Sequence, residues 1–306
     1  MLNRSSARAQ TGGAPVFIGM VAAIVVVAGL QFVTSGELRV WLQVVLLGIV
    51  EGVTEFLPIS STAHLLIVGR LIGFEQSAGG TFEVFIQLGA VLAVVVFYAA
   101  DLLAQARALT TSAATRRFWL SIVLAFLPAA VVGLLLRKWI KAVLFQSPAL
   151  IAGSLIVGGM VLIIVETQLR RMPTTDDATA ITPQQALAAG GAQVLALVPG
   201  VSRSASSIVG GMLAGLSRSA ATVFSFYLVI PTLGAATLVD LVSSRDLLQG
   251  GDMARLLVGA AVAFVTAWLS IGWLLRYVAS SSFVSFGVYR IIAGTLILLL
   301  LAAGRL

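Results

Sequence analysis

The sequence contains no cysteine and one histidine, His64. It therefore excludes a disulfide framework, a thiolate nucleophile, a zinc–cysteine site and a metal site built from several histidines. Charged residues are also scarce: they make up 10% of the 306 residues, whereas soluble domains carry about a quarter. The chain thus lacks the polar surface with which a water-soluble globule of this length would cover itself.

What the sequence has in abundance is hydrophobic residues, at 59%. Apolar runs long enough to cross about 30 Å of hydrocarbon recur along the chain and predict an all-α polytopic membrane protein. Arg4 and Arg8 precede the first run, as in a secretory signal, but no small-residue cleavage pattern follows it, which favours an uncleaved span. The predicted spans are 16–33, 82–100, 118–136, 148–166, 219–240, 256–275 and 286–304.

The formal net charge of +7 would suggest a nucleic-acid partner in a soluble protein. Here the Arg and Lys residues lie mostly between the apolar runs, where such residues contact anionic lipid headgroups. No basic stretch is interleaved with aromatics, so we expect membrane lipids and no nucleic acid as partners. Basic residues flank the runs on both sides and give no firm orientation.

Two apolar stretches, 38–75 and 184–217, are interrupted by Pro, Gly, Ser and charge and do not read as simple spans. When the second is aligned on the first, they resemble each other, and their interruptions coincide. This alignment, made without gaps, pairs Gln43 with Gln185, Ser60 with Ser202, Ala63 with Ala205, Gly69 with Gly211, Gly73 with Gly215 and Phe82 with Phe224, and it sets Glu51 on Gln193.

Three spans separate the two broken stretches, so re-entrant hairpins formed by them would enter the membrane from opposite faces. This arrangement is an inverted-topology repeat, whose breaks meet near the midplane. We therefore predict an N-terminal extension with an extra span at 1–37 and a single domain at 38–306. Within that domain the repeats cover about 38–167 and 184–306.

Two carboxylates lie in the first broken stretch. Glu51 and Glu55 are four residues apart, so a helix places both on one face. Each costs roughly 2.5–3.5 kcal/mol at bilayer depth, and a divalent cation, an arginine or protonation must offset that cost. A solvated interfacial helix is the alternative, but the residues at 44–50 and 56–57 are apolar or Gly.

The break itself, at Pro58, is followed by three hydroxyl residues, Ser60, Ser61 and Thr62. Helix capping explains part of this cluster. It does not explain His64, which follows directly. A lone histidine is often structural, but an ionisable group inside an apolar membrane segment indicates function by default.

Arg203 is the charged residue of the second break, in the stretch Pro199-Gly200-Val-Ser202-Arg203-Ser204-Ala-Ser206-Ser207. Its fork of donors suits phosphate oxygens. Gly200 lets backbone approach an anion closely, and the serines add donors. The alternative is that Arg203 forms a structural ion pair with Glu51 or Glu55, and both roles can hold.

Together these residues indicate phosphoryl transfer assisted by a divalent cation. The sequence has no P-loop, and no Gly-x-Ser-x-Gly motif stands at either break. Because inverted repeats with broken helices are typical of transporters, transport or flipping of a lipid phosphate or anion is the alternative. A silent relative that only binds lipid phosphate is a third.

The sequence resembles the undecaprenyl-diphosphatase family, also called the bacitracin-resistance protein family, from about residue 38 to the end. It departs from the usual pattern at Ala63, Ala205, Ser207 and Val223. The resemblance rests on Glu51-Gly-Val-Thr-Glu55-Phe-Leu-Pro58-Ile-Ser60-Ser61-Thr62 with His64, on Pro199-Gly-Val-Ser202-Arg203-Ser204, and on 87–90, 224–231 and 286–290.

The resemblance implies hydrolysis of undecaprenyl pyrophosphate to the monophosphate and inorganic phosphate, which recycles the lipid carrier for cell-wall synthesis. It implies Mg²⁺ or Ca²⁺, a homodimer, and a multi-pass protein of the bacterial cytoplasmic membrane whose site faces the outer side. It assigns Glu51 and Glu55 to metal and catalysis, Ser61 to attack or phosphate binding, His64 to acid/base chemistry and Arg203 to the phosphate clamp, with Ser60, Thr62, Gly200, Ser202, Ser204 and Ser207 as substrate-binding residues. Whether Ser61 or water attacks stays open.

Overall fold

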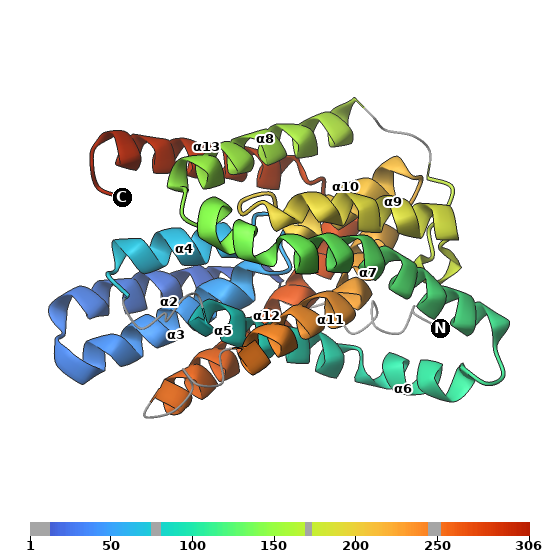
Figure 1. Ribbon diagram of the computed structural model, residues 1–306, viewed down its shortest axis with the longest axis horizontal. Coiled ribbons are helices and arrows are strands. Elements are labelled where there is room, and N and C mark those ends of the chain that lie inside the picture. Colours follow the sequence, from blue (N-terminus) through green and yellow to red (C-terminus); the bar gives the residue numbers. More distant parts are fainter. Residues whose placement is uncertain (1–12, 75–80, 169–172, 244–251) are drawn as a thin grey trace.

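The computed structural model describes residues 13–74, 81–168, 173–243 and 252–306, and these segments fold as helices without a β-strand (Figure 1). Three short turns, Ile140–Leu144, Ala178–Ala180 and Val194–Leu197, accompany the α-helices. The α-helices are α2 Gly13–Val33, α3 Gly36–Thr54, α4 Ser61–Leu71, α5 Thr81–Phe97, α6 Ala99–Ala108, α7 Ala113–Trp139, α8 Pro148–Thr167, α9 Pro183–Gln193, α10 Arg203–Leu213, α11 Arg218–Ser243, α12 Asp252–Ser280 and α13 Val284–Ala302.

Five helices of the described segments are long and apolar enough to cross a membrane. They confirm the predicted spans at 118–136, 148–166, 219–240, 256–275 and 286–304. The predicted first span is a shorter apolar helix, Ile18–Leu30, within α2. The spans are Ala113–Leu136, Pro148–Thr167, Arg218–Val239, Met253–Ser280 and Val284–Ala302.

The predicted span at 82–100 is bent near its end. The chain bends by 67° between Phe82–Phe97 and Ala99–Ala108. Tyr98 leaves the helical region, with φ −99° and ψ 15°. Beyond it, α6 carries Asp101 and Arg107 and has no buried residue, so it lacks the apolar face that would let α5 continue straight through hydrocarbon.

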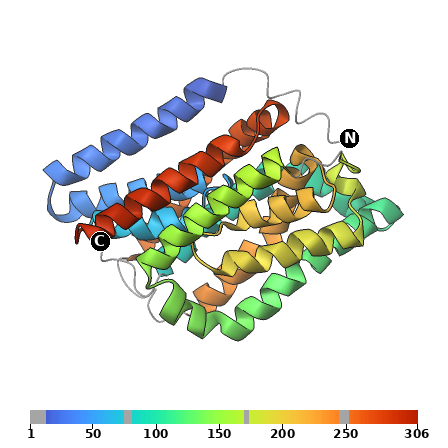
Figure 2. The same cartoon turned by 90° about the horizontal axis from the view of Figure 1, so that it is seen from above.

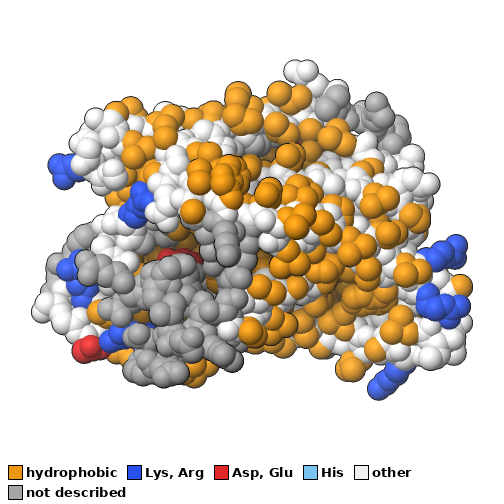
Figure 3. All heavy atoms as spheres, viewed as in Figure 1, with side chains coloured by type: hydrophobic (Ala, Val, Ile, Leu, Met, Phe, Trp, Pro, Cys, Tyr) orange, Lys and Arg blue, Asp and Glu red, His pale blue; other side chains and the backbone are white. Residues whose placement is uncertain are grey.

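The surface of the molecule matches a lipid environment. Figure 3 shows hydrophobic side chains over most of the middle of one face, with Lys and Arg gathered towards two opposite ends. Leu134 and Leu135 are 63% and 77% exposed, which in water would leave a large apolar patch uncovered. The chain is therefore a multi-pass membrane protein.

The correspondence between the two broken stretches extends from the sequence to the backbone. Helices α4 and α10 are both 11 residues long, and their first residues are Ser61 and Arg203. The residues before them, Ser60 and Ser202, have φ of 71° and 77°. These are the non-glycine residues with positive φ in the described chain, and such a conformation is costly for a residue with a Cβ.

One side-chain contact is also repeated. Gln43 Nε2 donates to the carbonyl of Ile72 at 2.7 Å, and Gln185 Nε2 donates to the carbonyl of Ala214 at 3.2 Å. The alignment that pairs Gln43 with Gln185 also pairs Ile72 with Ala214. In each stretch the glutamine therefore ties the helix before the break to the end of the helix after it.

The two broken stretches occupy opposite halves of the molecule. In Figure 1, α3 and α4 lie in the left half and α9 and α10 in the right half, and their breaks point towards the middle. Helix α12 packs on α3, and α7 packs on α9. Helices α8 and α13 lie side by side in both ribbon views (Figures 1 and 2).

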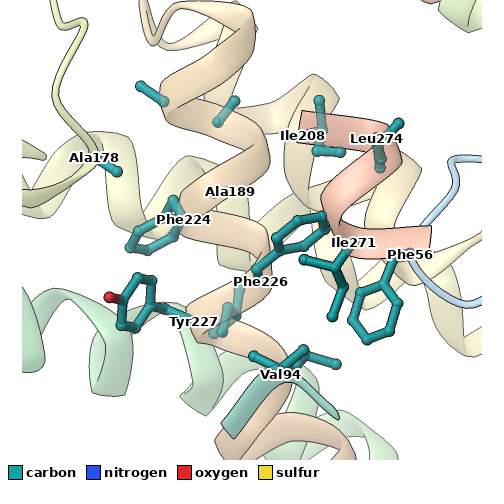
Figure 4. Packing of buried hydrophobic residues seen from close by; sticks show 14 of the residues in the cluster. Phe56, Val94, Ala178, Ala189, Ile208, Phe224, Phe226, Tyr227, Ile271 and Leu274 are labelled. Carbon is teal, nitrogen blue, oxygen red and sulfur yellow. The ribbon is translucent and has the colours of Figure 1, made fainter. Parts of the chain in front are cut away.

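The turn after Glu55 is anchored in the core. Phe56 is fully buried and meets the ring of Phe226 on α11 edge to face, with centroids 5.3 Å apart. Figure 4 shows Phe56 beside Ile271 of α12 as well. Such aromatic pairs add about 0.5–1.5 kcal/mol to the area they bury. This packing fixes the position of the carboxylates that precede it.

Candidate active site

A row of three side chains joins the two breaks. The hydroxyl of Ser61, the first residue of α4, donates to Oε2 of Glu55. The other carboxylate oxygen of Glu55, Oε1, accepts from Nη2 of Arg203 on α10 at 3.0 Å. Both charged side chains are largely buried, at 5% and 10% exposure. The structure thus brings residues 148 positions apart in the chain into one site.

Glu51 lies one helical turn before this row. The backbone N–H of Glu55 donates to its carbonyl at 2.9 Å. Its side chain is fully buried, and neither carboxylate oxygen has a hydrogen-bond partner among the described residues. A buried carboxylate without a partner is costly, so its two free oxygens need a cation or a proton.

The chemistry of these donors fits a divalent cation. Mg²⁺ and Ca²⁺ take oxygen ligands, and Mg²⁺ is often held by one or two carboxylates with substrate phosphates and waters completing the shell. Within the described segments no group of three or more His, Asp or Glu side chains could hold a metal ion. Glu51 and Glu55 would be the carboxylate ligands of such an ion, because the oxygens of Glu51 are free and Glu55 lies one helical turn away, and phosphate oxygens would supply others.

Arg203 is oriented by a residue that the sequence interpretation missed, Ser225 of α11. Nη1 of Arg203 donates to both the carbonyl and the hydroxyl of Ser225, each at 3.0 Å. The hydroxyl of Ser207 lies 2.8 Å from that of Ser225 and extends the support. The guanidinium is thus fixed by α11 on one side and by Glu55 on the other.

The remaining hydroxyl residues hold the breaks themselves. Ser60 and Ser202 cap α4 and α10, as the capping interpretation expects. The hydroxyl of Ser204 donates to the carbonyl of Leu57 at 2.9 Å and so connects the second break to the first. Thr62, in the first turn of α4, is half-buried. Substrate contact by these four side chains stays a prediction.

A second missed residue, Arg290 of α13, is fully buried and bonded to backbone carbonyls. Nη1 donates to Pro58 at 3.1 Å, and Nη2 donates to Gly200 at 2.8 Å. Further bonds reach Ser154 and Leu155 of α8. One guanidinium therefore holds both breaks in place against a neighbouring helix.

Gly200, a predicted substrate-binding residue, is required by the backbone. It has φ of +96°, and a Cβ there would lie 2.6 Å from the carbonyl oxygen of Ile151. Its own carbonyl is already bound by Arg290. These constraints explain the glycine without a ligand, and its contact with substrate stays a prediction.

His64 shares the first turn of α4 with Ser61, but its ring faces another partner. Nδ1 lies 2.7 Å from the carbonyl oxygen of Ser60, and Nε2 lies 2.7 Å from the hydroxyl of Tyr289 on α13. Both ring nitrogens are therefore bonded outside the row that joins Ser61, Glu55 and Arg203. Tyr289 was not among the predicted site residues.

Comparisons with known proteins add the family. A family model described as bacitracin resistance protein BacA matches residues 44–296, which include both breaks and exclude α2. A protein named undecaprenyl-diphosphatase from Deinococcus radiodurans is 48% identical over 269 residues, 87% of this chain and 97% of the relative. Proteins of the same name from Albidiferax ferrireducens and Cereibacter sphaeroides are 46% and 47% identical, over 84% and 86% of this chain and 94% and 97% of theirs.

Proposed function

The chain belongs to the bacitracin resistance protein BacA family, and we propose that it hydrolyses undecaprenyl pyrophosphate to undecaprenyl phosphate and inorganic phosphate. This reaction returns the lipid carrier to cell-wall synthesis. Relatives named undecaprenyl-diphosphatase match the chain over nearly their whole length. The observation that carries the proposal is the row from Ser61 through Glu55 to Arg203, which combines a nucleophile, a base and a phosphate-binding cation.

In our mechanism, Ser61 attacks the distal phosphorus of the pyrophosphate. Its proton passes to Glu55, the carboxylate to which it already donates. The bond from that phosphorus to the bridging oxygen breaks, and undecaprenyl phosphate leaves. Water then hydrolyses the phosphoserine, which releases inorganic phosphate and restores the hydroxyl of Ser61.

Arg203 contributes charge in this mechanism. Its guanidinium is fixed by Ser225 before substrate arrives, so little reorganisation is needed to receive phosphate oxygens. The ion pair with Glu55 is compatible with this role, because a carboxylate that takes the proton of Ser61 releases part of its hold on the guanidinium.

The rival mechanism has water attack directly, with His64 and a glutamate as activating groups. Rapid quenching of a reaction with radiolabelled distal phosphate separates the two. Attack by Ser61 predicts label bound covalently to the intact protein, and Ser61→Ala removes that label. Turnover without any trapped label in the wild-type protein would favour water.

We also propose that Glu51 and Glu55 bind Mg²⁺ or Ca²⁺. The free, buried oxygens of Glu51 support this assignment. A bound divalent cation would neutralise charge on the phosphate oxygens and the leaving group. Thermal unfolding with and without the metal tests the proposal independently of turnover: each ion should raise the melting temperature of the wild-type protein, and Glu51→Gln should abolish that rise.

We propose the placement of the protein in the membrane from the arrangement of its helices and its basic residues. The α3–α4 and α9–α10 pairs lie in opposite halves of the molecule (Figure 1), and basic residues gather at its two ends (Figure 3). These features support re-entrant hairpins that enter from opposite faces. We place the protein in the bacterial cytoplasmic membrane, as a homodimer, with the site opening to the outer side. Labelling of introduced cysteines from each side of sealed vesicles tests the orientation.

Transport is the less favoured function. Broken-helix repeats are typical of transporters, but a serine hydroxyl held on a carboxylate is a feature that hydrolysis needs and transport does not. The names of the relatives also favour hydrolysis.

One assay decides between these functions. The purified protein in detergent–lipid micelles is given undecaprenyl pyrophosphate or undecaprenyl phosphate, with Mg²⁺, Ca²⁺ or EDTA, and released phosphate is measured. We expect release from the pyrophosphate alone and only with a divalent ion. Glu55→Gln is the matched inactive control. Absence of release from the pyrophosphate under every condition would contradict the proposed function.

A further inference from the structure

The environment of His64 fixes where the protons of its ring lie. A carbonyl oxygen can only accept a hydrogen bond, so the 2.7 Å contact with Ser60 requires that Nδ1 carries a proton. In a neutral imidazole the other nitrogen, Nε2, is then the acceptor. The hydroxyl of Tyr289, 2.7 Å away, must donate to it.

The two rings are also held in register. They lie nearly parallel, with an interplanar angle of 9° and centroids 5.7 Å apart. The carbonyl of Ser60, the N-cap residue of α4, holds the ring of His64 through Nδ1. Ser60 itself has a strained backbone, with φ of 71°. Tyr289 stands next to Arg290, which binds the carbonyl of Pro58 in the same break.

From this geometry we infer that Tyr289 is a positioning residue for His64, so that the phenol and the imidazole act as one unit in the reaction. The carbonyl of Ser60 holds the ring in its Nδ1-protonated form, and the hydroxyl of Tyr289 keeps the acceptor nitrogen on the side of α13. When the imidazole takes up a proton at Nε2, the same hydroxyl accepts from it, because a phenol both donates and accepts. Tyr289 thereby serves both protonation states without a movement of either ring.

Ser61 and His64 form hydrogen bonds with different groups. Ser61 donates to Glu55, whereas the acceptor nitrogen of His64 is turned to Tyr289. The imidazole therefore takes no proton directly from Ser61 in this arrangement, and its part in turnover depends on the hydroxyl that orients it. The kinetic side of the inference rests on the proposed hydrolysis, whereas the state of the ring does not.

The chain offers a direct readout, because His64 is its one histidine. Protein labelled with ¹⁵N-histidine, with any purification tag removed, gives the signals of one imidazole. At a pH where that ring is neutral, we expect a protonated Nδ1 and a hydrogen-bonded, unprotonated Nε2. In Tyr289→Phe, Nδ1 should stay protonated while the Nε2 signal shifts. A ring protonated at Nε2 in the wild-type protein, or an Nε2 signal unchanged in the variant, would overturn the inference.

Kinetics supply the second test. Tyr289→Phe removes only the hydroxyl, and we expect kcat to fall about tenfold with KM unchanged, less than the 10²–10⁴-fold contribution typical of a general acid or base itself. In a His64→Gln background the same change should have no further effect. Tyr277→Phe is the matched control: its hydroxyl bonds to the carbonyl of Ser282 and to Ser285, and its loss should leave kcat intact.

The outcomes separate this inference from the proposed function. Equal losses of kcat from Tyr289→Phe with and without His64 would show that the phenol acts elsewhere. Wild-type kcat in Tyr289→Phe would show that the hydroxyl is dispensable. If the wild-type protein releases no phosphate at all, the proposed function fails, and the nitrogen signals of His64 still decide whether Tyr289 positions the ring.

Discussion

At the first position of α4 stands Ser61, and at the equivalent position of α10 stands Arg203. On the helices that precede the breaks, Glu51 of α3 corresponds to Gln193 of α9, and both side chains are buried. Helices α4 and α10 agree in length and in their strained caps, and a glutamine ties each of them to the helix before the break. The same local fold therefore carries the two carboxylates and Ser61 in one broken stretch and the guanidinium in the other.

This difference has an electrostatic reason. Two identical acidic halves would bring four carboxylates together, and two identical basic halves would bring two guanidinium groups together. Each arrangement buries like charges, which costs several kcal/mol without a counterion. Dividing the signs lets Glu55 and Arg203 compensate each other at 3.0 Å when the two breaks meet. Glu51 is left without such a partner, and this is why we propose it as a ligand of a metal ion.

We expect the largest loss of turnover from a substitution of Arg203, the residue that pairs with Glu55 across the two breaks. Arg203→Lys keeps the charge but loses the fork that reaches Glu55 and Ser225 together. We expect kcat/KM for phosphate release to fall by about 10²–10³-fold, as for loss of a preorganised donor. Arg218→Lys, at an ion pair with Glu166 outside the site, is the control and should stay active. Near-normal turnover by Arg203→Lys would contradict the proposal that the guanidinium of Arg203 binds phosphate.

Glu51→Gln tests the difference between the two broken stretches, because it replaces the carboxylate of the first with the amide that Gln193 provides in the second. Removing a metal ligand should lower turnover by about 100-fold. Without metal, the variant should melt at a higher temperature than the wild-type protein, since it no longer buries an unpaired carboxylate. The reverse change, Gln193→Glu, should lower the melting temperature. A metal-induced rise in melting temperature that survives Glu51→Gln would contradict the ligand role.

Arg290 has no counterpart in the repeat, since extending the same alignment backwards places Pro148 at the equivalent position. Arg290→Met should leave the carbonyls of Pro58 and Gly200 without their donor. Each buried unsatisfied group costs about 1–3 kcal/mol, so we expect a marked fall in unfolding temperature in lipid nanodiscs. Arg290→Lys should recover part of it. Unchanged stability in Arg290→Met would show that the breaks hold each other without this residue.

The smallest effects concern the repeated glutamines. Gln43→Ala removes one hydrogen bond to Ile72 and should cost about 1 kcal/mol. Gln185→Ala should cost more, because Gln185 also contacts Thr175 at 3.2 Å and completes a capping box with Thr182. Unfolding of the two variants is measured under identical conditions, and both should retain turnover. A larger loss for Gln43→Ala than for Gln185→Ala would show that the additional bonds of Gln185 do not add to stability.

The sequence predicts much of the architecture. The apolar runs predict five of the spans. The alignment of the two broken stretches pairs Gln43 with Gln185, and these two side chains make equivalent hydrogen bonds in the structure. The bend at Tyr98 escaped detection, because an aromatic residue continues the apolar pattern and periodicity alone does not register a change in backbone angle. Composition shows that a segment is apolar but does not show whether it is straight.

In the site, the predicted residues Glu55, Ser61 and Arg203 do meet. Each stands at a break, where charge and hydroxyl groups interrupt an apolar pattern. The missed residues, Ser225, Tyr289 and Arg290, lie within long apolar helices. There a serine reads as a small packing residue, and a Tyr or Arg reads as an interfacial anchor. The stretches 224–231 and 286–290 carry part of the family resemblance, but only the packing of α11 and α13 shows which of their side chains contact the breaks or His64.

The absence of cysteine permits a direct test of whether the two breaks lie against each other. The hydroxyl of Ser204 lies 2.9 Å from the backbone carbonyl oxygen of Leu57. Leu57→Cys with Ser204→Cys therefore places two thiols within reach of a short bifunctional methanethiosulfonate reagent, which joins them through bonds that a reductant breaks. A protease site inserted between α8 and α9 then cuts the chain into its two repeats. Met20→Cys with Ser270→Cys, at a side-chain contact between the same two fragments, is the control pair.

After reaction with this reagent and cleavage, the fragments of the Leu57/Ser204 pair are separated on a denaturing gel without reductant. The account predicts that they stay joined and come apart only when reductant is added, as in the control pair. Neither single cysteine variant should join them. Fragments that separate without reductant, while the control pair remains linked, would show that the carboxylates and Arg203 belong to different sites.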